Sequence, residues 1–310
     1  MADGESPTIA RLRVRIAVRE AREAAGLTQA QVAESLEWSH SKVIRIENGD
    51  NTISIQDLRG LLALLNIQDK KRVDALLADA RIARKRQPEQ SAWWKKSPFR
   101  EEMSDPLRRF VEYEAEASEI RSFNIFYVPG PLQTSAYGAA LTAMWKGDGE
   151  ALSEESEGGG FTEKKVEALV DARRLRREAM QRRSGSLKYL VLFDQSVLMR
   201  PIGGASIFAA QLQQIVDLAG AGFTKVRMLP FDLPIAIANN GSYDLLQVGE
   251  DGSRSEVMYR ESGPKDEMVE NRPVTERHRH RFDQLWEAAT AESDTINFIR
   301  TRIDSLAKPK

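Results

Sequence analysis

Apolar side chains recur every three to four positions through the first 85 residues, a spacing typical of helices with one buried face. The clearest stripe consists of Leu58, Leu61, Leu62 and Leu65. Residues suited to begin or end a helix separate the stripes, and they are Gly26, Thr28, Ser39, Gly49, Ser54 and Asp69. The pattern therefore predicts five short helices and a compact all-α domain over residues 1–86.

Residues 87–106 interrupt the periodic pattern with prolines and mixed charges, and this segment is interpreted as a linker. Trp93 and Trp94 lie within it, and we expect them to pack against one domain rather than to bind a partner.

Helical and strand-like patterns alternate over residues 107–310. Helices are predicted near 107–117, 162–183, 205–220, 273–289 and 292–306. Strands are predicted within "RSFNIFYVPGPL", in "SLKYLVLFD", in "KVRMLPFD" and on both sides of an Asp-Gly turn at 251–252. The expected fold class is α+β overall, with an all-α N-terminal domain followed by an α+β domain over 107–310.

Composition narrows the class of protein. The 310 residues are 41% hydrophobic and 29% charged, with a net charge of −1 and no cysteine, which excludes disulfides and cysteine metal sites. No signal peptide and no apolar run long enough to span a membrane is visible, so we expect a soluble cytoplasmic protein. Residues 1–86 carry 15 Lys and Arg against 12 Asp and Glu, the sign expected of a DNA-binding domain.

The segment "GLTQAQVAESLEWSHSKVIRIENG" has the pattern of a helix-turn-helix. The expected core positions are Val32, Ala33, Leu36, Trp38, Val43 and Ile46. Ser39 is suited to begin the second helix. Glu37 occupies a turn position that favours glycine, because the backbone there has a positive φ.

In such a motif the second helix enters the major groove, and its outward side chains reach base edges. The expected base-reading residues are His40, Ser41 and Arg45, of which Arg45 suits bidentate binding of guanine. Phosphate contacts are expected from Gln29, Ser39, Lys42 and Asn48. The alternative is a pair of packed helices that never touches DNA, with Arg45 paired to Glu47 or to another acid.

Over residues 10–66 the chain resembles the Xre family of phage-repressor-like helix-turn-helix proteins, on "GLTQ", "SKVIRIENG" and the leucine-rich helix that follows. The resemblance implies binding of double-stranded operator DNA, usually as a homodimer at inverted repeats.

The segments "VPGPLQT", "LMRPIGG" and "VRMLPF" make 107–290 similar to an actinobacterial regulator family, whose Xre-type domain precedes a C-terminal domain of unknown function. Pro131 stands where that family more often has Leu. The resemblance implies a transcriptional regulator of the type found in Streptomyces, often paired with a small protein encoded nearby. The alternative that it leaves open is an antitoxin-like module that sequesters this partner and uses DNA binding for autoregulation.

Residues 107–310 offer little for catalysis. They hold no nucleophile elbow and no phosphate-binding loop, and His278 and His280 lie two positions apart on a predicted helix, so they point to nearly opposite faces. We therefore expect no enzyme activity, no catalytic residue, no cofactor and no metal. The basic run over 162–183 is interpreted as a solvated helix with internal ion pairs. A candidate loop over a partner or ligand contains Leu233, Pro234, Ile235 and Ile237, although core packing is the commoner role of such residues.

Overall fold

The computed structural model describes residues 6–85, 92–144, 162–234, 241–249, 255–262 and 265–307. Its contacts divide the chain into unit 1, Met1–Ser91, and unit 2, Ala92–Lys310. The linker expected over 87–106 is therefore too long, because residues 92–106 pack within unit 2. The physical reason is aromatic burial, since Trp94 is only 6% exposed.

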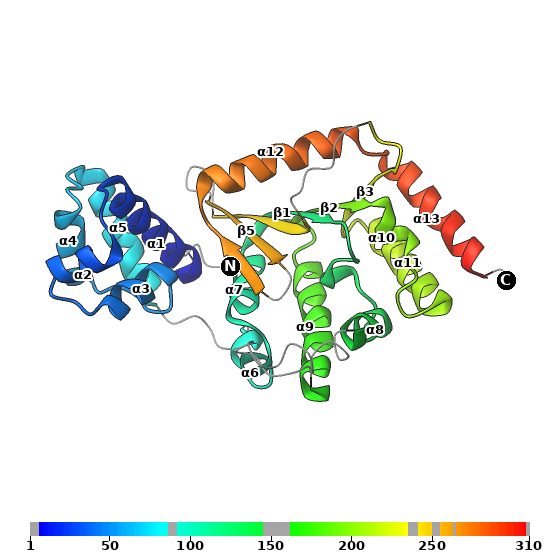
Figure 1. The fold of residues 1–310 in the computed structure, drawn as a ribbon, viewed down its shortest axis with the longest axis horizontal. Helices are drawn as coiled ribbons and strands as arrows, with labels where there is room; N and C mark the ends of the chain where they lie inside the picture. Colours follow the sequence, from blue (N-terminus) through cyan, green and yellow to red (C-terminus); the bar gives the residue numbers. More distant parts are fainter. Residues whose placement is uncertain are drawn as a thin grey trace. The chain divides into compact units, whose positions relative to one another are not determined.

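Unit 1 is all-α, as predicted. Within its described residues the helices are α1 (Pro7–Ala24), α2 (Gln29–Ser35), α3 (His40–Asn48), α4 (Ile55–Leu64) and α5 (Lys70–Ala83), drawn in blue to cyan in Figure 1. Thr28, Ser39, Ser54 and Asp69 each accept a hydrogen bond from a backbone N–H in the first turn of the next helix. The capping residues expected from the sequence thus begin four of these helices.

One core joins these helices. Val14 and Val18 of α1 meet the leucine stripe of α4 and Leu77 of α5. Because every helix contributes to the same cluster, the position of α3 is determined by packing on several sides rather than by its own short length.

Unit 2 mixes helices with one sheet. Its described helices are η1 (Trp93–Lys95), α6 (Phe99–Glu102), α7 (Asp105–Glu114), η2 (Gly130–Leu132), α8 (Ser135–Met144), α9 (Glu163–Gln181), α10 (Gln195–Met199), α11 (Ala205–Gly220), α12 (Arg272–Ala288) and α13 (Glu292–Ala307). Its described strands are β1 (Ala117–Asn124), β2 (Lys188–Asp194), β3 (Lys225–Leu229), β4 (Tyr243–Val248), β5 (Ser255–Ser262) and β6 (Lys265–Val269).

The strands of this part of the chain form a single sheet in the order β3-β2-β1-β4-β5-β6. β1, β2 and β3 are parallel, whereas β4 pairs antiparallel with β1 and continues into an antiparallel β5 and β6. The carboxyl ends of the three parallel strands therefore lie side by side, at the same end of the strands.

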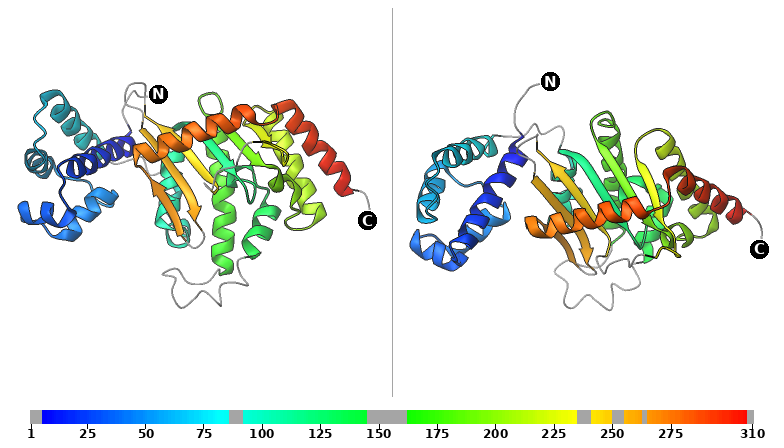
Figure 2. Two further views of the ribbon diagram at one scale, coloured as in Figure 1. Left: turned by 45° about the horizontal axis from the view of Figure 1, so that its top comes forward. Right: turned by 90° about the horizontal axis from the view of Figure 1, so that it is seen from above.

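Helices cover both faces of the sheet. Figures 1 and 2 show α12 crossing the strands on one face, with α7, α9 and α11 on the other. On the α12 face, Phe282 and Leu285 pack against Phe123 of β1 and Leu192 of β2. Alternate positions on the same strands, such as Ile120 and Val191, are buried on the opposite face.

The α+β fold class is confirmed, with local corrections. Ala117, expected at the end of a helix, begins β1, which is paired by β2 on one side and β4 on the other. Pairing of Ala117 with Val248 of β4, and pairing on both sides from Glu119 onward, outweigh the helical preference of Ala117 and its neighbours. The pattern also failed to predict α8 and β6. The expected Asp-Gly turn at 251–252 lies outside the described residues.

Candidate nucleic-acid interface

The turn between α2 and α3 has the backbone that the sequence predicts. Glu37 has a φ of 54°, so its backbone is left-handed, as expected for this position, although it is not a glycine. Such a residue costs about 1 kcal/mol or slightly more. Two caps compensate for it. Thr28 and Gln31 bond reciprocally at the start of α2, and the Ser39 hydroxyl accepts the Lys42 amide at 3.2 Å.

The six residues assigned to the core of the motif pack together. Val32, Ala33, Val43 and Ile46 are buried, and Leu36 and Trp38 are half-buried against the same cluster. The Lys42 ammonium lies 3.9 Å from the centre of the Trp38 ring. This aromatic side chain therefore has one side in the core and one side against a cation.

The three residues assigned to base reading are exposed on α3. His40, Ser41 and Arg45 all point away from the core. The Arg45 side chain makes one weak hydrogen bond, from Nε to the Ser41 carbonyl at 3.4 Å, and no described carboxylate pairs with it. Its guanidinium is therefore available to an external acceptor, and the alternative pairing with Glu47 does not occur.

Glu47 instead lies in the core of unit 1, with 2% of its surface exposed. Its carboxylate accepts hydrogen bonds from Arg22 Nε at 2.6 Å, Arg22 Nη2 at 3.0 Å and Gln29 Nε2 at 2.9 Å. The hydrogen bonds and charge of Glu47 raise the pKa of Arg22 despite its partial burial. This buried ion pair connects α1, α2 and α3.

Two more arginines of α1 hold the end of α3. Arg15 donates to the Asn48 carbonyl at 2.6 Å, and Arg19 donates to the Glu47 carbonyl at 2.5 Å. These carbonyls belong to the last turn of α3, which lacks partners within its own helix. Gly49 follows with a φ of 82°, and a Cβ there would lie 2.3 Å from Arg15 Nη1. Sequence reasoning missed this contact, although Arg15, Arg19 and Arg22 recur at helical spacing.

The residues assigned to phosphate contacts are partly engaged within unit 1. Lys42 pairs with Asp57 at 3.1 Å, and Gln29 donates to Glu47. Ser39 uses its hydroxyl as the cap of α3, whereas the Asn48 side chain is exposed. Lys42 and Gln29 would have to leave or share their present partners in order to bind phosphate.

Comparison with known families assigns both units. Residues 14–76 match a helix-turn-helix domain, and residues 107–301 match the domain of unknown function DUF5753. The second match covers more than half of the chain. The chain belongs to the DUF5753 family. No curated protein and no solved structure matches it. It therefore combines a helix-turn-helix domain, a fold that indicates DNA binding, with a DUF5753 domain of unknown function.

The DUF5753 domain contains a buried ionic cluster between α7, α9 and the sheet. Arg176 donates from Nε and Nη2 to the two carboxylate oxygens of Glu114, both at 2.8 Å. Burial lowers the pKa of Arg176, but the charge and hydrogen bonds of Glu114 outweigh it, and the pKa is raised. Burial raises the pKa of nearby Asp244 to about 6, against the opposing effects of the Ser122 hydroxyl and the Arg176 charge.

Arg173 of α9 and Arg183, two residues beyond the end of that helix, also face inward. Arg183 donates to the carbonyls of Glu114 and Ala117, and burial lowers its pKa. Arg173 donates to the Thr142 hydroxyl at 3.0 Å, and burial, together with the charge of Arg176, lowers its pKa to about 10. The solvated helix expected here is thus wrong for this face. It is right for Arg174, which pairs with Asp171 and Glu178 on the exposed side.

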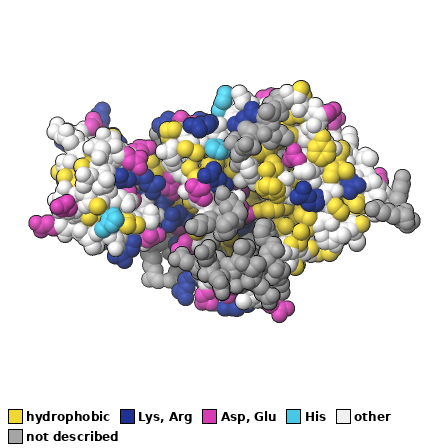
Figure 3. Space-filling model, in the orientation of Figure 1, with side chains coloured by type: hydrophobic (Ala, Val, Ile, Leu, Met, Phe, Trp, Pro, Cys, Tyr) yellow, Lys and Arg dark blue, Asp and Glu magenta, His cyan; other side chains and the backbone are white. Residues whose placement is uncertain are grey.

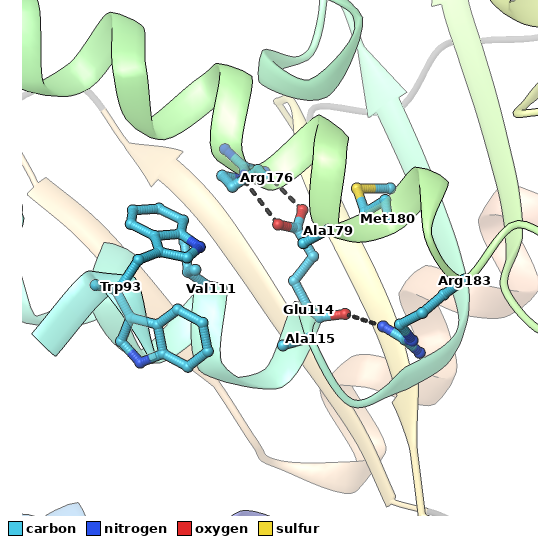
Figure 4. A pocket seen from close by; sticks show the side chains of 9 residues that line it. Trp93, Val111, Glu114, Ala115, Arg176, Ala179, Met180 and Arg183 are labelled. Carbon is cyan, nitrogen blue, oxygen red and sulfur yellow. Dashed lines mark hydrogen bonds and ion pairs between the residues drawn. The ribbon is translucent and has the colours of Figure 1, made fainter. Parts of the chain in front are cut away.

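A small hollow beside this cluster is lined by η1, α7 and α9 (Figure 4). Trp93 packs edge-on against Trp94 at 5.7 Å and against Phe99 at 4.8 Å. Glu114 and Arg176 meet across the hollow from α7 and α9. The two tryptophans therefore pack against one domain, as expected, and they fix the start of unit 2 to its ionic cluster.

The "VPGPLQT" segment is held by side-chain bonds to its backbone. Gln211 of α11 donates to the Leu132 carbonyl at 2.8 Å and accepts the Thr134 amide at 2.7 Å. Gly130 lies against α9, where a Cβ would lie 2.9 Å from Arg176 Nη1. The segment is thus a tightly bonded turn that connects α9 and α11.

The remaining candidate sites give less support for a function. In the expected partner loop, Leu233 packs partly against the α12-side core and Pro234 is exposed, whereas Ile235 and Ile237 lie outside the described residues. His278 is buried and His280 is exposed, as expected of opposite faces. In the described residues, no cluster of His, Asp and Glu could hold a metal. None of the described helices is long and apolar enough to cross a membrane.

Proposed function

We propose that this protein is a sequence-specific transcriptional regulator of the bacterial cytoplasm, of the actinobacterial Xre type, and that it acts by binding rather than by catalysis. Its recognition helix α3 lies in the major groove of operator DNA, with His40, Ser41 and Arg45 at base edges. The observation that supports this most is the state of Arg45, which is exposed and has no carboxylate partner in the described structure.

The surrounding contacts support a preorganised reading helix. Arg15, Arg19 and Arg22 hold the C-terminal turn of α3, so its N-terminal turn projects as a rigid end. Arg45 binds guanine O6 and N7 bidentately, which is worth roughly 1–3 kcal/mol of discrimination. A homodimer places two such helices about 34 Å apart, one turn of DNA, on an inverted repeat.

Selection of bound duplexes from a random pool tests the proposal. Arg45→Ala should weaken binding to the selected sequence about 5- to 150-fold, while binding to random DNA changes little. The control is Arg81→Ala, which removes the same charge from an exposed position of α5. An equal loss on selected and random DNA would show that Arg45 touches only phosphate. Failure to enrich any sequence would refute sequence-specific DNA binding itself.

The DUF5753 domain is proposed to receive a small protein partner or a ligand that controls DNA binding. Two exposed aromatic side chains support this role, namely Phe126 at 51% and Phe231 at 66% exposure. They follow β1 and β3, which are parallel and therefore have their carboxyl ends on the same side of the sheet. Open α/β sheets commonly bind ligands outside the carboxyl ends of their strands. In the antitoxin-like alternative, sequestering the partner is the main role. Co-expression with any small neighbouring gene product, followed by purification of the full chain, tests for such a complex, and its absence refutes the antitoxin-like alternative.

A further inference from the structure

Arginine is concentrated in the first half of α12. Residues 272–281, "RPVTERHRHR", contain four arginines and two histidines against a single glutamate, and no lysine. This half begins at the helix N-terminus, where the helix dipole favours acidic side chains, yet the first turn of α12 contains none. By contrast, α13 has Glu292 and Asp294 in its first turn. The charge order of α12 is therefore the reverse of the one that stabilises a helix.

Most of this charge faces solvent, because the opposite side of α12 is packed on the sheet. Thr275, His278 and Phe282 are buried there. Arg277 and His280 are exposed, and Arg279 and Arg281 lie on the two shoulders of the exposed face. Dark blue Lys and Arg side chains lie beside cyan His side chains over this part of unit 2 in Figure 3.

Internal partners neutralise only part of this face. Arg272 pairs with Glu276 at 2.7 Å while remaining 77% exposed, and Arg279 lies 3.6 Å from Glu256. Arg277 has no hydrogen-bond or ion-pair partner among the described residues. It also lies one helical turn from Arg281, a like-charge spacing that destabilises a helix. An external anion would relieve this repulsion.

We propose that the basic face of α12, formed by Arg272, Arg277, Arg279, His280 and Arg281, is a second DNA contact that binds backbone phosphates outside the operator bases. This inference rests on the proposed DNA-binding function. Guanidinium groups bind phosphate oxygens bidentately, and Arg272 to Arg281 spans about 13 Å of helix, a length over which duplex DNA carries roughly eight phosphate charges.

We favour DNA over an acidic protein as the ligand because the helix-turn-helix and α12 belong to the same chain. Once the helix-turn-helix is bound, DNA is held near the DUF5753 domain at a high effective concentration, so individually weak phosphate contacts become significant. Such contacts add affinity and salt dependence without sequence preference.

The test measures the affinity of the full chain for the selected operator duplex with long flanks and for a random-sequence duplex, over a range of salt. Arg272→Ala/Arg277→Ala should reduce the salt slope on both duplexes by about 1.8 units, or 0.9 for each lost phosphate contact, so that wild-type loses about 12-fold more affinity than the variant between 50 and 200 mM salt. The α9 control is Arg174→Ala/Arg182→Ala, at one position on α9 and one directly after its end, which removes the same charge from exposed positions and should leave the slope unchanged.

An unchanged slope for the α12 variant overturns the inference, and so does an equal reduction in the α9 control. If the α12 variant binds both duplexes normally but loses a co-purifying protein, the face binds an acidic partner and the inference is again wrong. These outcomes are distinct from failure of the proposed function, in which wild-type enriches no sequence and Arg45→Ala has no selective effect. Both substituted arginines of the variant are exposed, so an unchanged melting temperature confirms that its fold is intact.

Discussion

Substitution of Glu47 is the sharpest test of how the recognition helix is held. The side chain is 2% exposed and accepts three hydrogen bonds, two of them from the Arg22 guanidinium, which is itself only 12% exposed. Glu47→Gln keeps the shape of the side chain but removes its charge. It leaves Arg22 without its main counter-charge, because Glu23 is the only other carboxylate that pairs with Arg22 in the described structure.

Breaking a buried ion pair by removing one partner costs about 3–5 kcal/mol. We expect the lower end for Glu47→Gln, about 3 kcal/mol, because Arg22 keeps its bond to the Leu27 carbonyl at 2.9 Å. For a unit of this size such a loss lowers the melting temperature by roughly 12–24 °C. Native-state hydrogen exchange of the α3 amides reports the loss locally, so unfolding of the DUF5753 domain does not obscure it.

Glu23→Gln is the matched control. Glu23 contacts the same guanidinium at 3.4 Å but is 54% exposed, so its removal should cost less than 1 kcal/mol. The difference between the two variants should persist at 0.5 M salt, because a buried pair is screened far less than an exposed one. If both variants lose the same protection of α3, burial is not what makes the Glu47 pair strong, and the account of how α3 is held is wrong.

Two further substitutions test the backbone of unit 1 and the cluster of unit 2. Gly49→Ala should destabilise unit 1 by about 2 kcal/mol or more, since its φ of 82° disfavours a side chain and its Cβ would displace Arg15, and an unchanged urea midpoint would contradict this. Asp244 has a pKa of about 6, above its ordinary value of 3.8, so the folded state binds the proton more tightly and its stabilisation is lost as pH rises through 6. The urea stability of unit 2 should therefore lose about 1.4 kcal/mol between pH 5 and pH 7.5 from this carboxyl, and Asp244→Asn should abolish that loss rather than preserve it.

The fold of unit 1 could be predicted because its signals are local. Caps such as Ser39 act on backbone groups two or three residues away, and the Glu37 turn is visible in the spacing of the motif. The side of α3 that faces outward follows from the same periodicity. Hydrophobic periodicity does not predict buried polar contacts. From its spacing Glu47 is expected at the surface, whereas the tertiary structure buries it beside Arg22 and Gln29.

The sheet of unit 2 was harder to predict because its pairing is non-local. Ala117 belongs to β1 because it pairs with Val248 of β4, and β2 joins the other side of the strand from Glu119 onward; both partners are more than 60 residues away in sequence. β6 is short and charged, and the features that make it a strand are its pairing with β5 and its contact with α7, where Ser104 at the start of the helix bonds Asp266. Neither the pairing with β5 nor the contact with α7 can be predicted from the spacing of hydrophobic residues.

The two arginine-rich helices of the DUF5753 domain show why composition alone does not identify a binding surface. Arg176 of α9 and Arg183, just beyond the end of α9, point inward, where a carboxylate and backbone carbonyls accept their hydrogen bonds, so these charges stabilise the fold. On α12, Arg277 points outward and has no acceptor among the described residues. The distinction is whether each guanidinium has an internal acceptor. By that criterion the inward arginines of α9 are structural, whereas the basic face of α12 has charge left over for an anion from outside the chain.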